Sequence, residues 1–324
     1  MPLLPYALIR PWLFAWDAET IHDVTLRWLS ATQHSPLRHL YAQSRINDPV
    51  HLAGLTFPNR VGLAAGLDKN ALCIDAWQAM GFGFVEVGTV TPVGQPGNPK
   101  PRMFRLPKAQ ALINRLGFNN LGVDHLVENL KRRTPRGVVG INIGKNFDTP
   151  IERAADDYVD CLRKVYPFAS FVTANVSSPN TSGLRNLQHD QLLDHLLGSL
   201  ARARADLVAQ GLRHVPIAVK IAPDLDDAGI DAIADRVLAH GLDAVIATNT
   251  TLSRSGVDHL PASQEAGGLS GTPLRERSTK VVERLARAID GRIPIVGVGG
   301  IGSAKDAMEK LRAGATLVQL YSAL

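Results

Sequence analysis

FVTANVSSPNT, residues 171–181, decides the predicted fold, because an apolar run ends there in a cluster of small polar side chains. Other short apolar runs behave in the same way, and most of them also end in a polar residue or a glycine. Parallel strands that helices cover on both faces read as continuous apolar runs. Eight of them, alternating with helices, predict a (β/α)8 TIM barrel, in which functional residues lie at the carboxyl ends of the strands. The runs begin near Val61, Phe84, Val138, Phe171, Ile217, Ala244, Ile295 and Leu317.

The composition fits one barrel with an appendage. The chain has 324 residues, of which 45% are hydrophobic, and a barrel of this type typically needs about 250. Two cysteines without zinc-type spacing, and ten histidines without an HExxH motif, lead us to expect no metal. A net charge of +5 favours anionic partners. The basic residues are dispersed, however, which argues against nucleic acid.

Residues 1–45 differ from the barrel, residues 46–324, and hold three of the four tryptophans. They predict two short amphipathic helices, and Pro11 is expected either to kink the first of them or to start a new segment. Such helices can lie in a membrane interface, or they can pack on the barrel, for example as a plug at its bottom; the spacing leaves both open. No run approaches the roughly 20 apolar residues of a membrane span. The predicted stripes are Leu4, Leu8, Trp12 and Ala15, then Ile21, Val24 and Trp28 after the N-cap Asp17.

Helix boundaries and one insertion can also be predicted. Residues 149–152 read as a capping box, in which Thr149 caps a helix with proline at its first position. Ser303 is expected to cap a later helix, which Gly314 ends. The longest insertion, residues 91–119, is expected to hold a hairpin of residues 103–106 and 111–113.

The glycine-rich stretch 297–302 matches GxGxxG between a strand and a helix. A dinucleotide-binding fold would need an acidic residue about 20 positions later, where this chain has Ser322, and only one strand remains. In a barrel, the loops after strands seven and eight commonly bind phosphate. Together with Gly271, these glycines predict a site for the phosphate of a mononucleotide. Glycines used only for tight turns are the alternative.

Asparagines gather at the predicted strand ends, where Asn175 and Asn180 flank Ser178. Neutral amides offer both donors and acceptors, which suits a planar ligand carrying carbonyl and N–H groups. Lys69 and Lys220 add positive charge for a carboxylate or an anionic reduced cofactor. The other candidate amides are Asn114, Asn142 and Asn249.

The same residues leave three other functions to consider. A Ser-His-Asp hydrolase is poorly supported, because GxSxG is missing and no histidine stands at a strand end. A Schiff-base aldolase using Lys69 or Lys220 is a better rival, although an amide-rich site does not resemble a sugar-phosphate clamp. A catalytically dead barrel that only binds membrane is the third possibility.

Seven ordered motifs carry a resemblance that runs from about Pro5 to Leu324. The chain resembles the quinone-dependent (class 2) dihydroorotate dehydrogenases of bacteria. The resemblance implies an FMN enzyme of pyrimidine biosynthesis that oxidises (S)-dihydroorotate to orotate and passes the electrons to a membrane quinone. The motifs are residues 62–69, 86–92, 114–120, 140–146, 175–181, 247–251 and 297–301.

The resemblance also implies roles for residues. Ser178 would be the catalytic base, although from the residues alone it could equally be a turn residue before Pro179. FMN would be held by Ala65, Gly66, Leu67, Asp68, Lys69, Thr89, Asn142, Asn175, Lys220, Thr248, Gly271, Gly300, Tyr321 and Ser322. Dihydroorotate would be bound by Lys69, Asn114, Arg115, Leu116, Gly117, Phe118, Asn175, Asn180, Asn249 and Thr250.

Serine at position 178, where soluble family members have cysteine, favours the quinone-linked branch, and so does the apolar N-terminal segment. We therefore expect a monomeric, peripheral protein on the cytoplasmic face of the inner membrane. Family members continue beyond strand eight through a closing helix. This sequence ends at Leu324, so we expect the eighth barrel helix to be missing and one flank to expose apolar surface.

Overall fold

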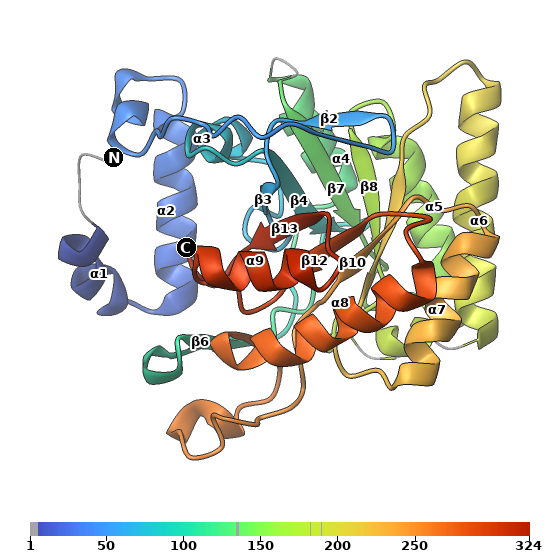
Figure 1. Cartoon of the computed structure of the whole chain (residues 1–324). Coiled ribbons are helices and arrows are strands. Elements are labelled where there is room, and N and C mark those ends of the chain that lie inside the picture. The colour runs from blue at the N-terminus through green and yellow to red at the C-terminus, as the bar shows by residue number, and fades with distance from the viewer. Residues whose placement is uncertain (1–5, 134–135, 182, 189) are drawn as a thin grey trace.

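The computed structural model describes residues 6–133, 136–181, 183–188 and 190–324. Eight parallel strands close into a barrel in the order β3-β4-β7-β8-β9-β10-β12-β13 (Figure 1). Each begins at the residue predicted from the apolar runs, so the TIM-barrel prediction is confirmed. The strands are β3 (Val61–Leu63), β4 (Phe84–Val90), β7 (Val138–Ile143), β8 (Phe171–Asn175), β9 (Ile217–Ile221), β10 (Ala244–Ala247), β12 (Ile295–Val298) and β13 (Leu317–Leu320).

Helices surround the barrel (Figure 1). In the described chain, each barrel strand except β13 is followed by one of them, and β13 is followed by a bend at Tyr321 and a turn at residues 322–323. The helices are α3 (Ile74–Ala79), α4 (Val123–Lys131), α5 (Ala154–Val165), α6 (Asp190–Ala209), α7 (Asp227–Ala239), α8 (Arg275–Ile289) and α9 (Ala304–Arg312).

Two of the three predicted caps are confirmed. The Asp17 side chain accepts a hydrogen bond from Thr20 N, and the Ser303 side chain accepts one from Asp306 N. The capping box at Thr149 is wrong, because α5 begins only after a 3-10 turn, η3 (Ile151–Arg153). The Thr149 hydroxyl instead donates to Asp157 Oδ2 at 2.7 Å, and a charged acceptor makes the stronger hydrogen bond.

A hairpin of β1 (Val50–Leu52) and β2 (Leu55–Phe57) closes the amino end of the barrel. The Phe57 ring meets the edge of Phe84, with centroids 5.2 Å apart, and Phe84 lies 6.3 Å from Phe171. These rings fill the barrel interior below the strand ends. The hairpin was not predicted. It occupies the bottom of the barrel, the position that the plug interpretation gave to the N-terminal helices.

The N-terminal helices, α1 (Tyr6–Phe14) and α2 (Ala18–Thr32), lie beside the barrel and not beneath it (Figure 1). Helix α2 packs on α3 and on the loop after β3, where His22 Nε2 lies 2.8 Å from Leu67 O. Buried Glu19 forms an ion pair with Arg102 at 2.6 Å. The plug interpretation is therefore wrong.

Helices α1 and α2, with the turn between them, expose several large apolar side chains. Helix α1 continues through Pro11, while Leu4 of the predicted stripe lies outside the described residues. Helix α2 buries Leu26 and Leu29, so part of the predicted apolar face points outward instead of into the core. None of the helices that the structure describes combines the length and the apolar character of a membrane span. The exposed side chains include Leu8 (68%), Trp12 (77%), Trp16 (63%), Val24 (51%) and Trp28 (43%).

A second sheet stands beyond the carboxyl ends of the barrel strands, at the opposite end from β2 in Figure 1. Strands β5 (Met103–Leu106) and β6 (Ala111–Asn114) form the predicted hairpin, which is confirmed. Strand β11 (Gly268–Gly271), from the loop after β10, pairs with β6 and was not predicted. Two long loops are thereby joined over the same face.

Candidate active site

The side chains that point into the barrel change from apolar to polar toward the carboxyl ends of the strands. Because strand side chains alternate, Glu86 lies above the inward ring of Phe84, and Asn175 above that of Phe171. The same alternation places three more polar side chains above inward apolar ones. They are Asn142 above Val138, Lys220 above Ala218, and Gln319 above Leu317.

Glu86 is a fully buried carboxylate at the base of this polar layer. Asn142 Nδ2 donates to its Oε1 at 2.7 Å, and Gln319 Nε2 donates to its Oε2 at 2.5 Å. Sequence reasoning placed Glu86 in a motif but gave it no role, and it missed Gln319. The available signal was one carboxylate within the otherwise apolar start of a strand.

Lys220 is buried beside this carboxylate. Burial lowers the pKa of the Lys220 ammonium, and the Glu86 charge acts in the opposite direction. The ammonium makes no hydrogen bond to any other residue that the structure describes. A buried cation without a hydrogen-bond partner is costly, so it fits an anionic or electron-rich ligand at this position.

Three of the five predicted amides, Asn142, Asn175 and Asn249, form one connected network at the ends of the barrel strands. Asn175 Nδ2 donates to Thr89 Oγ1 at 3.0 Å and to Asn142 Oδ1 at 3.2 Å. Asn249 Nδ2 donates to Asn175 Oδ1 at 3.2 Å and to Ser177 Oγ at 3.0 Å. Each amide is oriented by its neighbours, so the donors and acceptors stand in fixed places.

Ser178 lies in the turn after β8 and is 4% exposed. Its Oγ accepts a hydrogen bond from Asn180 N at 3.2 Å and donates to none of the described residues, so its proton is available to a ligand. The hydroxyl oxygens of Thr181 and Thr250 are buried without a partner in the described chain. The site therefore contains several hydroxyls that the protein leaves unsatisfied.

The loop after β3 brings Lys69 to the same end of the barrel. Burial lowers the pKa of Lys69 to about 8, and the Asp23 and Glu19 carboxylates partly offset this. Asp68 shapes the loop, because its carboxylate accepts hydrogen bonds from Leu72 N and Cys73 N, both at 2.8 Å. Its carbonyl accepts one from Gly88 N, beside Thr89.

The structure also brings together residues of the predicted phosphate site. Gly271 (φ +93°) and Gly300 (φ +73°) adopt backbone conformations that favour glycine. A Cβ atom at Gly300 would lie 2.4 Å from the backbone of Arg275, at the start of α8. The Ser322 hydroxyl donates to Ser270 Oγ at 2.8 Å, which joins the end of β13 to β11. Helix N-termini and close backbone approach both favour phosphate.

The predicted stretch 114–118 divides into two parts. Asn114 Oδ1 accepts a hydrogen bond from Asn180 Nδ2 at 3.2 Å, and Phe118 lies near Gly144 and Thr89. The Arg115 guanidinium instead pairs with Glu265 at 2.6 Å. Leu116 and Gly117 offer their carbonyls to Asn98 N and Gln95 Nε2, so these two residues and Arg115 hold the insertion in shape.

Comparison with known proteins agrees with this geometry. Residues 49–324 match the family model described as dihydroorotate dehydrogenase. The chain is 57% identical to "Dihydroorotate dehydrogenase (quinone)" of Albidiferax ferrireducens and 57% identical to that of Delftia acidovorans. Each match covers 100% of this chain, and 95% and 94% of the relatives.

Among solved structures, DHODH from Eimeria tenella in complex with ferulenol is similar, with a TM-score of 0.86 and 40% identity. The match covers 94% of this chain and 86% of that one. The ligand-free form from the same organism gives a TM-score of 0.85. The chain therefore belongs to the dihydroorotate dehydrogenase family.

Proposed function

We infer that this protein oxidises (S)-dihydroorotate to orotate in pyrimidine biosynthesis, with a quinone as electron acceptor. Family membership supports the reaction, and the amide network beside Ser178 is the observation at the site that carries it. The test is the visible spectrum of the purified protein, followed by anaerobic addition of dihydroorotate. A yellow protein that bleaches is expected. A colourless protein that cannot be reconstituted with FMN, or a yellow one that does not bleach, contradicts the function.

We propose FMN as the cofactor. Bound FMN would supply the redox chemistry, which is hydride acceptance and electron transfer to the quinone. The residues fit this group in two respects: Lys220 has no hydrogen-bond partner in the described chain, and the backbone around Gly271 and Gly300 approaches too closely for a side chain. The residues that would hold FMN are those named above from the resemblance, with Asp68 acting through its backbone.

The substrate is proposed to lie against the amides, with its carboxylate near Lys69. Oxidation removes a proton from the carbon next to a carbonyl, and Ser178 accepts that proton. A neutral hydroxyl is a weak base, so Ser178 loses its own proton in the same step, and nearby positive charge lowers the cost. The Thr181 hydroxyl, buried without a partner in the described chain, is our candidate for passing that proton on.

The alternative functions find no support in the family. A Schiff-base aldolase would use the neutral amine of Lys69 or Lys220, and borohydride in the presence of substrate would label that lysine. The curated relatives are named as dehydrogenases. The catalytically dead membrane-binding barrel would leave the buried hydroxyls and the Lys220 ammonium without a purpose.

Substrate affinity is expected to depend on pH through Lys69. The protonated ammonium attracts the carboxylate of the ligand, and the pKa of Lys69 is lowered to about 8. Below this pH the charge is present, so the Kd for orotate should be constant; above it the charge is lost, so the Kd should rise with pH. Titration of the flavin spectrum with orotate from pH 7 to about 9.5 measures this change in Kd.

The control variant Lys69→Arg, which stays protonated, should remove the rise in Kd. A rise of equal size in Lys69→Arg would assign the titration to another group.

We propose that α1 and α2 bind the membrane surface and admit the quinone, on the cytoplasmic face of the inner membrane, with the protein as a monomer. The exposed side chains Trp12 and Trp16 support this. Burial of a large apolar side chain contributes about 1.5–3 kcal/mol, so Trp12→Ala with Trp16→Ala should weaken vesicle binding by at least about tenfold.

Two measurements check this role. The double variant should lose turnover with a long-chain quinone and keep turnover with a soluble dye. Val208→Ala is the matched control, because Val208 is also exposed (40%) but lies on α6, across the barrel from α1 (Figure 1). Vesicle binding that is unchanged in the double variant would remove α1 from the membrane contact.

A further inference from the structure

Arg185 and Asp224 form an ion pair next to the loop that carries Ser178. Arg185 lies in η4 (Leu184–Gln188), after β8, and Asp224 follows β9. Arg185 Nη1 is 2.8 Å from Asp224 Oδ2, and each side chain is only 20% exposed. Sequence reasoning assigned a role to neither residue, and neither belongs to the set proposed to contact substrate or cofactor.

The Arg185 guanidinium uses its other donors on two loops of the site. Its Nε donates to Ser177 O at 3.2 Å, and its Nη2 donates to Thr250 O at 2.8 Å. A peptide group is planar, so holding Ser177 O also fixes the nitrogen and Cα of Ser178. One side chain thus ties the loop of the proposed base to the loop that lines the substrate.

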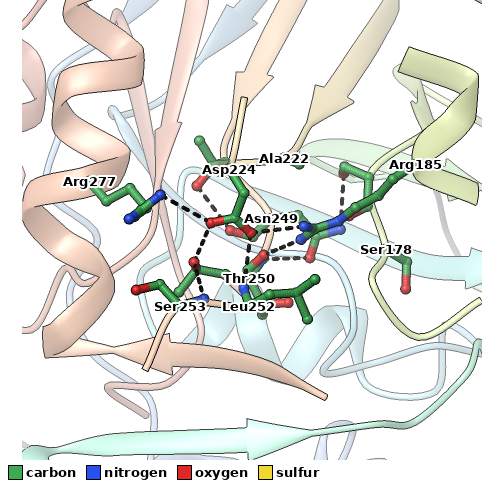
Figure 2. A network of polar contacts seen from close by, with 12 residues as sticks. Ser178, Arg185, Ala222, Asp224, Asn249, Thr250, Leu252, Ser253 and Arg277 are labelled. Carbon is green, nitrogen blue, oxygen red and sulfur yellow. Dashed lines mark hydrogen bonds and ion pairs between the residues drawn. The ribbon is translucent and has the colours of Figure 1, made fainter. Parts of the chain in front are cut away.

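Asp224 is itself held in place. Its carboxylate accepts hydrogen bonds from the Thr251 hydroxyl and from Leu252 N, the latter at 2.9 Å. Figure 2 shows Arg185 and Arg277 approaching Asp224 from opposite sides; Arg277 Nη1 lies 3.3 Å from Oδ1. Burial alone would raise the pKa of Asp224, but these hydrogen bonds and Arg185 hold it below its usual value. The carboxylate therefore stays charged and orients the guanidinium.

We propose that Arg185, oriented by Asp224, is a positioning residue that sets Ser178 against the carbon it deprotonates. Arg185 touches the carbonyl that precedes Ser178 and not the Ser178 hydroxyl, so it acts through the backbone. This inference rests on the proposed function. Because misplacement of a reacting group by about 1 Å can cost 10²-fold in rate, loss of this pair should slow the proton-transfer step specifically.

Arg185→Met tests the proposal in the FMN-loaded enzyme, since it keeps the aliphatic stem and removes every donor. The rate constant for flavin bleaching at saturating dihydroorotate should fall by up to about 10²-fold. The FMN content and the rate of reoxidation by quinone should be unchanged. Arg185→Lys should not restore the rate, because one ammonium lacks the fork that reaches three acceptors.

Asp224→Asn tests whether Asp224 acts by orienting the Arg185 guanidinium. It also tests the proposal if Arg185→Met fails to fold. It should slow bleaching in the same selective way. The double variant should be no slower than Arg185→Met, because residues that act as one unit are not additive. An additive loss would show that Asp224 does not act through Arg185 and would overturn the pairing.

Arg204 and Asp243 provide the matched control. This ion pair is buried to a similar extent, and Arg204 Nη2 also holds a backbone carbonyl, Gly241 O, at 2.7 Å. Asp243 precedes β10, however, so the pair lies at the amino end of the barrel. Arg204→Met should leave bleaching unchanged. Normal bleaching in Arg185→Met would overturn the inference, and so would an equal loss in bleaching and in reoxidation by quinone. If dihydroorotate does not bleach the wild-type protein, the proposed function is overturned instead.

Discussion

Replacement of Ser178 by alanine is expected to slow flavin reduction by dihydroorotate by about 10²–10⁴-fold, the usual contribution of a positioned general base. The protein should remain yellow, because Ser178 is not among the residues proposed to hold FMN. Its Oγ only accepts a hydrogen bond, from Asn180 N, within the described chain. The fold therefore loses little when the hydroxyl is removed, and the effect should fall on the chemical step.

The measurement is anaerobic stopped-flow bleaching, with quinone reoxidation as the internal control. Ser178→Cys supplies a group with a pKa of about 8.5. A cysteine variant should therefore recover part of the rate, and the recovery should grow as the pH approaches that value. Rapid bleaching of the alanine variant would remove Ser178 from the mechanism and return it to the role of a turn residue before Pro179.

The barrel was predictable because its strands are buried on both faces, which leaves continuous apolar runs with clear starts. The hairpin of β1 and β2 was not, because its strands have three residues each and include exposed polar side chains. In α2, helical spacing indicated that Val24 and Trp28 share a face, but spacing does not say what covers that face. The barrel packs on the neighbouring face, at Leu26 and Leu29.

The candidate site was predictable where chemistry is concentrated locally. Asn175, Ser178 and Asn180 stand within one short stretch at a strand end, and the structure connects them with Asn114 and Asn249. Arg185 and Asp224 are separated by 39 residues, and no local pattern links them. Their pairing follows from the neighbouring positions of β8 and β9 in the closed barrel. Contacts of this kind depend on topology and leave no signature in a single sequence.

Lys220→Ala is expected to have the other large effect, on both flavin reduction and flavin content. Lys220 is proposed to supply positive charge beside the cofactor, and loss of one such electrostatic partner typically costs about 10²–10³-fold in rate. The variant also leaves the buried Glu86 carboxylate without its nearby cation. Breaking a buried pair costs at most about 3–5 kcal/mol, and less is expected here because Asn142 and Gln319 still donate to Glu86.

A double variant, Lys220→Ala with Glu86→Gln, separates these two consequences. It removes the uncompensated carboxylate, so the free energy of unfolding, measured with urea, should return toward the wild-type value. The positive charge is still missing, so slow bleaching by dihydroorotate should persist. Recovery of both properties would mean that Lys220 serves only to neutralise Glu86, because no charge would then be needed beside the cofactor. Persistent slow bleaching in a stable protein would assign the rate effect to the charge of Lys220 itself.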